Sequence, residues 1–237
     1  DSRQDSTISA STTPTVTTQS ASSVTKNAAV GNGNITSTGG ETVTRRGFCY
    51  KVGASGDPTV ADSVVYDDGT FGTGAYTKAL SGLSAGTAYR IRAYAINSKG
   101  TSYGTTVAFT TLNVPTVTTA AISEVKETTA KGGGNVTSDG GDTITERGIC
   151  YKTSTGPTTA DSKVTSAGTT GAFVASLSGL TPGQTYYVRA YAINSSGTSY
   201  GSEVSFIAQP LNFIIIGSET IDPDLLPIGK WGLSEWA

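Results

Sequence analysis

The sequence contains no histidine, no methionine and only two cysteines among its 237 residues. Histidine is the commonest general base near neutral pH and the commonest metal ligand, so most hydrolase and metalloenzyme chemistries lose their usual residues here. The chain also lacks any stretch approaching the ~20 apolar residues that a membrane helix needs. We therefore expect no enzymatic activity, no cofactor, no metal and no membrane span.

Charge is scarce as well. Charged residues make up 14% of the chain and the net charge is −2, so no basic stripe is available for nucleic acid and none is expected as a partner. Low charge also argues against simple disorder, because disordered chains are usually charge-rich. The chain opens on Asp1 rather than methionine, which favours a processed product whose signal peptide, if it had one, has been removed.

What the sequence does contain is one long segment written twice. LTPGQTYYVRAYAINSSGTSYG (residues 180–201) nearly repeats LSAGTAYRIRAYAINSKGTSYG (residues 83–104). Cys49 in RRGFCYK matches Cys150 in ERGICYK, and Pro14 in PTVTT matches Pro115 in PTVTT. Both pairs are 101 positions apart. A period near 100 residues is the size of a domain, so the sequence predicts two copies of one module.

Inside each copy, apolar and polar residues alternate with the period of two that is typical of half-buried strands. About seven short strands separated by turn residues predict an antiparallel β-sandwich. In the first copy the expected strands lie in PTVTT, around 28–36, over 43–50, in a segment ending near Leu80, over 89–97 and in SYGTTVAFTT.

The predicted organisation has four parts. A polar leader (1–13) is expected to be flexible, and the apolar tail (210–237) is expected to be β-prone. Between them lie the first module (14–112) and the second (113–209). The linker Leu112–Pro115 is very short and contains a proline, which favours a semi-stiff connection.

A corner motif recurs in each module, and in the first copy it lies between the strand that ends near Leu80 and the strand over 89–97. In LTPGQTY the leucine is expected to enter the core, Pro-Gly turns the chain, and the tyrosine hydroxyl bonds back to the backbone of the corner. The second copy therefore supplies Leu180 and Tyr186, and the first, reading LSAGTAY, supplies Leu83 and Tyr89.

The pattern LxPGxxYxVRAYAxNxxG resembles the fibronectin type III superfamily. The RGxCY and GTSYG segments look like the bacterial variant found in surface proteins of the Bacteroidetes type and in phage virion proteins. The resemblance covers about residues 14–209 and implies tandem fibronectin III-like sandwiches. The modules lack the tryptophan of animal modules, since both tryptophans lie in the tail, and no Arg-Gly-Asp occurs, so animal ligand motifs are not implied.

Alternation in the strand over 89–97 divides its residues between two faces. Tyr89, Ile91, Ala93 and Ala95 share one face, which is predicted to point into the core. The other face carries an arginine and a tyrosine that both copies keep, and these could contact a sugar ring or a partner protein. The alternative is that they only cover the sheet and pair with Glu146 or its neighbours. These outer-face candidates are Arg92, Tyr94, Arg189 and Tyr191.

Two other sets of residues have structural interpretations. Cys49 and Cys150 occupy the same position of separate modules, so no disulfide can form within a module, and each is expected to be a free strand residue that behaves as a small hydrophobe. Asp67 and Asp68 in YDDGTFG faintly resemble a calcium loop. The second copy has no matching acids, and the prediction is an ordinary turn.

The tail differs from both modules because it is strongly apolar. A β-branched run followed by two tryptophans must be covered, since an exposed run of this kind is prone to aggregate. Either it begins a third domain or it packs against another subunit. On the second hypothesis the assembly residues are Phe213, Ile214, Ile215, Ile216, Trp231 and Trp236.

These patterns favour a non-enzymatic structural or adhesive protein outside the cell, a bacterial surface appendage subunit or a virion component. Its expected partners are other copies of itself or a neighbouring structural protein, with surface glycans as a further partner class. The alternative is a carbohydrate-binding accessory fragment of a secreted glycoside hydrolase.

Overall fold

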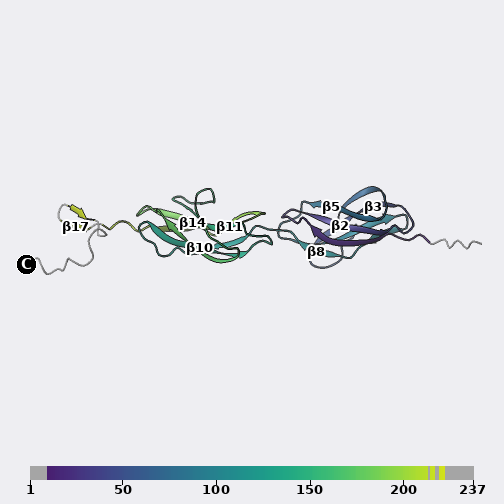
Figure 1. Ribbon diagram of the computed structural model, residues 1–237, viewed down its shortest axis with the longest axis horizontal. Coiled ribbons are helices and arrows are strands. Elements are labelled where there is room, and N and C mark those ends of the chain that lie inside the picture. Colours follow the sequence, from purple (N-terminus) through teal and green to yellow (C-terminus); the bar gives the residue numbers. More distant parts are fainter. Residues whose placement is uncertain (1–9, 213, 217–218, 222–237) are drawn as a thin grey trace, which may run out of the picture. The chain divides into compact units, whose positions relative to one another are not determined.

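The computed structural model describes residues 10–212, 214–216 and 219–221, and every regular element in these ranges is a β-strand (Figure 1). The chain forms two compact units, with the main division between Val114 and Pro115. All paired strands are antiparallel, which confirms the predicted all-β class.

The first module has two sheets. One has the order β1-β2-β5, and the other has the order β4-β3-β6-β7, with β8 also pairing with β6. Because β3 occupies one edge of β6, strands β7 and β8 share the other edge and pair with its two halves. The strands are β1 (Thr15–Ser22), β2 (Ala28–Ser37), β3 (Val43–Val52), β4 (Ser63–Phe71), β5 (Gly74–Ser81), β6 (Ala88–Asn97), β7 (Gly100–Tyr103) and β8 (Val107–Thr110).

The second module repeats this topology. One sheet has the order β13-β10-β9, and the other has the order β12-β11-β14-β15, with β16 pairing with β14. The strands are β9 (Thr116–Thr119), β10 (Thr129–Ser138), β11 (Glu146–Lys152), β12 (Ser162–Thr165), β13 (Gly171–Ser178), β14 (Thr185–Asn194), β15 (Gly197–Tyr200) and β16 (Val204–Ile207).

One local expectation needs correction. The acidic pair Asp67 and Asp68 does not form a turn, because both residues lie within β4 and pair with Arg46 and Arg45 of β3. Pairing with a neighbouring strand decides the structure of this segment, and its local composition does not. The closing segment SYGTTVAFTT forms two strands, since β7 ends at Tyr103 and β8 begins at Val107.

Each module has its own core between its two sheets. The predicted inner face of β6, from Tyr89 to Ala95, is buried in the first core together with Phe48 and Leu80. In the second core the matching residues of β14 pack with Ile149 and Phe173. The period-two pattern therefore placed the core residues of the sixth strand correctly.

The corner motif has the same geometry in both modules. The hydroxyl of Tyr89 accepts a hydrogen bond from the Ser84 amide at 2.9 Å, and the hydroxyl of Tyr186 accepts one from the Thr181 amide at 2.9 Å. Leu83 and Leu180 are buried beneath these corners. The ring of Tyr89 stacks on Phe109 of β8, and the ring of Tyr186 stacks on Phe206 of β16. Each corner therefore fixes the start of β6 or β14 to the core.

The gap between β7 and β8 is where the two sheets of the first module meet. The Ala93 amide of β6 donates to the hydroxyl of Thr18 on β1 at 2.9 Å, and the Gly104 amide bonds the Ala93 carbonyl at 2.9 Å. A side chain at Gly104 would lie 2.4 Å from the Thr18 hydroxyl, so only glycine fits. The same bonds recur in the second module between Ala190, Thr119 and Gly201.

We expect the first module to fold by itself, because its strands and core are complete within residues 14–112. That fragment should give a β-type circular dichroism spectrum and a single cooperative thermal transition. A helical spectrum, or the absence of any transition, would contradict an independent module.

Replacing Tyr186 by phenylalanine should lower the free energy of unfolding of the second module by about 1 kcal/mol or somewhat more, because the Thr181 amide loses its acceptor. Urea denaturation of the full chain measures the change. Tyr187→Phe is the matched control, since the Tyr187 hydroxyl has no hydrogen-bond partner among the described residues. Equal stability of the Tyr186→Phe variant and the parent would mean that the corner bond contributes nothing.

Candidate functional site

The outer-face tyrosines are not exposed, and this corrects the expectation of a stacking surface. Tyr94 is 1% exposed and Tyr191 is 0% exposed. Tyr94 lies opposite Gly47 on β3 and Tyr103 on β7, and the ring of Tyr103 is 6.4 Å from its own. Neighbouring side chains of the same sheet face therefore cover both tyrosines, and neither ring is available to a sugar.

The outer-face arginines also make their contacts with groups of their own modules. The Arg92 guanidinium donates to the Gly104 carbonyl at 2.9 Å and lies over the Tyr103 ring, 4.6 Å from its centre. Arg189 makes the same two contacts, with the Gly201 carbonyl at 3.0 Å and the Tyr200 ring at 4.6 Å. These arginines tie the sixth strand to the gap where the two sheets meet.

In the second module, the Tyr191 hydroxyl donates to Glu146 at 2.6 Å, and Lys163 bonds the same carboxylate at 2.7 Å. The alternative interpretation of the outer face, that it pairs with Glu146, therefore describes this module. The hydrogen bonds from Lys163 and Tyr191 lower the pKa of Glu146. Burial is the main cause of the raised pKa of Tyr191.

The first module fills the equivalent region with different charges. Arg45 stands where the second module has Glu146, and its guanidinium bonds Asp68 at 2.6 and 3.1 Å. The same guanidinium covers the ring of Tyr66 at 4.1 Å from its centre. Tyr66 is 41% exposed, so it is the most open aromatic ring among the described residues, although one of its faces is covered by Arg45.

The other acid of the pair is also matched by a cation, because Asp67 is ion-paired with Lys78 of β5. Within the described ranges, no group of three or more Cys, Asp or Glu side chains is arranged to hold a metal ion. The two aspartates therefore act as ion-pair partners between strands.

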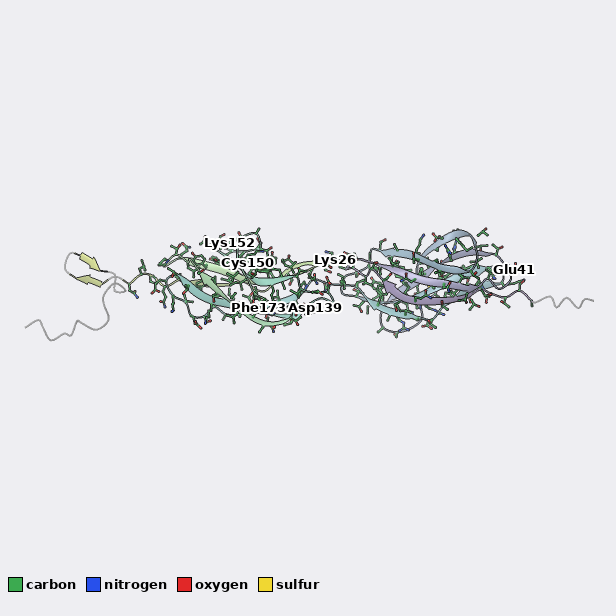
Figure 2. The ribbon with its side chains drawn as sticks, in the orientation of Figure 1. Lys26, Glu41, Asp139, Cys150, Lys152 and Phe173 are labelled. Carbon is green, nitrogen blue, oxygen red and sulfur yellow. The ribbon has the colours of Figure 1, made fainter. Side chains whose placement is uncertain are left out.

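Both cysteines are buried free thiols, Cys49 on β3 and Cys150 on β11, and Figure 2 labels Cys150. They lie opposite Arg92 and Arg189 on the face of the larger sheet that points away from the core. Burial raises the pKa of Cys49 to about 11 and also raises the pKa of Cys150. A thiol that stays protonated is a poor nucleophile, so each cysteine behaves as a small buried residue.

One feature of the second module was missed by the sequence analysis. Arg147, 7% exposed, directs its guanidinium at the loop before β13 and donates to the carbonyls of Ala167, Thr169, Thr170 and Gly171 at 2.6–3.1 Å. Arg147 also lies over the ring of Phe173, and its counterpart Arg46 lies over the rings of Phe71 and Tyr76. The sequence signal was present: Phe71 of the first copy has no aromatic counterpart in the second.

The structure separates the predicted tail residues into two groups. Ile214, Ile215 and Ile216 form β17, which pairs with β18 (Glu219–Ile221) as a two-stranded sheet. Phe213, Trp231 and Trp236 lie outside the described residues. No strand pairing between this hairpin and either module occurs among the described residues.

The comparisons with known proteins give no sequence relative, since no protein-family model and no curated protein matches the chain. Among solved structures, the crystal structure of the chicken CNTN1 FN1-FN3 domains is similar, with 16% sequence identity and a TM-score of 0.35. That match covers 84% of this chain and 69% of the chicken chain. In each module a three-stranded sheet faces a larger sheet, and each module has a tyrosine corner. Both modules are antiparallel β-sandwiches.

None of the described residues forms a helix of the length and apolarity that crossing a bilayer requires. The β-sandwich fold by itself is a scaffold that many functions share, so function must be argued from the surfaces that the two modules present.

We expect Glu146→Gln to reduce the acid sensitivity of the second module. The folded-state pKa of Glu146 lies below its ordinary 4.5, so its contribution to stability is present above that value and is lost as the pH falls through the folded-state pKa. Urea denaturation between about pH 6 and about pH 3 should show a smaller loss of stability in the variant.

Glu127→Gln is the charge-matched control, because the structure shows no ion pair for Glu127 among the described residues. If Glu146→Gln and Glu127→Gln lose stability with falling pH to the same extent, Glu146 is not an acid-sensitive contact.

Proposed function

We propose that this chain is a non-enzymatic structural or adhesive protein that assembles with other chains through residues 210–237. Its two fibronectin III-like modules act as spacers, and the tail makes the contact. Its place is outside the cell, as a subunit of a bacterial surface appendage or as a virion component. Its partners are other copies of itself or a neighbouring structural protein.

The observation that carries this proposal is the small sheet formed by β17 and β18. Each strand has three residues, and β17 is entirely isoleucine. An isolated two-stranded hairpin is marginally stable in water, and three or more strands or a packed face are needed for independent stability. A hairpin of this size and composition gains most by joining a larger sheet, which is the strand-addition mode of protein recognition.

The surfaces of the modules support the same conclusion. The tyrosines and arginines that both copies keep are used internally, either to close the sandwich or to pair charges within it. The glycan-binding alternative needs an open aromatic platform, and Tyr66, the most exposed ring, has Arg45 stacked on one face. The tail is therefore the better candidate for the principal contact.

Deleting residues 210–237 tests the proposal. The full chain should self-associate as its concentration is raised, and the shortened chain should stay monomeric while both modules keep their thermal transitions. Sedimentation velocity over a concentration series measures the association, and calorimetry measures the transitions.

A point variant makes the test sharper. Ile215→Lys places a charge in the middle of β17 and should reduce association as the deletion does, whereas Gln209→Lys adds the same charge at an exposed position before the tail and should not. A full chain that is monomeric at the highest attainable concentration would refute assembly through the tail and would favour the start of a third domain.

A further inference from the structure

The outer edge of β13 is an unprotected sheet edge. β13 pairs with β10 over eight consecutive residues without a bulge, from Gly171 to Ser178, and no strand among the described residues pairs with its other side. The strand contains no charged residue and no proline, and its outward-facing Val174 is 68% exposed. Proteins usually protect long, regular edges with charges, prolines or bulges, because bare edges pair with other chains.

The equivalent strand of the first module carries such protection. β5 reads GAYTKALS where β13 reads GAFVASLS. Lys78 of β5 lies between the buried Tyr76 and Leu80 on the core-facing side and ion-pairs with Asp67 of β4, at the edge of the facing sheet. An inward-pointing charge of this kind prevents a further strand from being added, since the added strand would bury it.

The second module has replaced both members of this ion pair. Ala175 stands at the position of Lys78 and is buried, and Ser166 follows β12 where Asp67 lies in β4. β12 is also shorter than β4, four residues against nine, and Arg147 holds the loop that follows it by its carbonyls. The ion pair that bridges the two sheets beside β5 is therefore missing beside β13, where Arg147 instead bonds the Gly171 carbonyl and lies over the Phe173 ring.

We propose that the β13 edge is the acceptor for the tail strand β17 of a second copy of this chain. This inference rests on the proposed function, because it names the surface on which the tail would be received. β17 is three residues long and uncharged, and β13 offers a regular, uncharged strand from Ala172 to Ser178, beyond the Gly171 carbonyl that Arg147 bonds. Pairing of β17 with β13, either antiparallel or parallel, would extend the three-stranded sheet to five strands. It would satisfy main-chain groups on the free edge of β13 and on the facing edge of β17.

This pairing has a consequence for the type of assembly. The donor and acceptor are different surfaces of one chain, so the contact is heterologous and each copy keeps one free donor and one free acceptor. Such a contact propagates from copy to copy unless the rotation closes a ring. The first module, with its protected edge, would take no direct part in the pairing.

The test is Val174→Lys in the full chain. Val174 is largely exposed, so the variant should fold, and the added charge should weaken self-association about tenfold or more, as measured by sedimentation velocity. Thr77→Lys is the matched control, because Thr77 is the same position on the protected β5 and its substitution should leave association unchanged.

A second variant places the added charge on the core-facing side of β13 rather than on its outer face. Ala175→Lys combined with Ser166→Asp restores the ion pair of the first module and leaves the outer face of β13 unaltered. It should also weaken association, with folding checked by circular dichroism. Alternate amides of β13 bond β10 in any state, so amide hydrogen exchange should show the remaining amides of residues 172–178 more protected in the associated full chain than in the chain lacking residues 210–237.

The outcomes separate this inference from the proposed function. If Ile215→Lys abolishes association while both β13 variants associate like the parent, the tail docks elsewhere: the β13 assignment fails and the proposed function stands. If association survives deletion of residues 210–237 but is lost in Val174→Lys, β13 pairs with another edge and the tail is not its occupant. A full chain that never associates overturns both.

Discussion

Closure of the sheet edges is the constraint on which the rest of this structure depends. In each module a threonine hydroxyl of the first strand accepts the amide of the sixth strand, Thr18 from Ala93 and Thr119 from Ala190, at the gap in the closing strand. A buried amide left without a partner there would cost about 1–3 kcal/mol. The glycine that permits the approach and the arginine that bonds its carbonyl follow from this contact.

The two modules differ at the other side of the sandwich, where the edge strands β5 and β4 of the first module and β13 and β12 of the second lie. The first closes it with an ion pair between sheets, Lys78 with Asp67, and with Arg46 stacked on Phe71. The second has small residues there and uses Arg147 to hold a loop instead. The modules therefore share one scaffold but present different surfaces. In the assembly that we propose, this asymmetry leaves one acceptor edge per chain, whereas two identical acceptors would allow two registers of pairing.

The sequence predicted the architecture well because the fold depends on local and repeated signals. The period-two pattern identified the inner face of β6, and the corner motif identified Tyr89 and Tyr186 together with the buried leucines. It placed Tyr94 and Tyr191 on the outer face, but it did not show that both are buried there. Alternation tells which side of a sheet a residue occupies, but burial on that side depends on neighbouring strands that periodicity does not reveal.

By itself, the sequence determined that the protein is two copies of an all-β module with an apolar β-prone tail, since repeats, turn residues and strand patterns are properties of short segments. Only the tertiary structure decided which charges meet and which edges are bare. Lys78 and Asp67 are paired because β5 and β4 lie at facing edges of two sheets, and the substitution of both in the second copy acquires a meaning only once that proximity is known. Contacts between distant segments are set by packing, which a linear pattern does not encode locally.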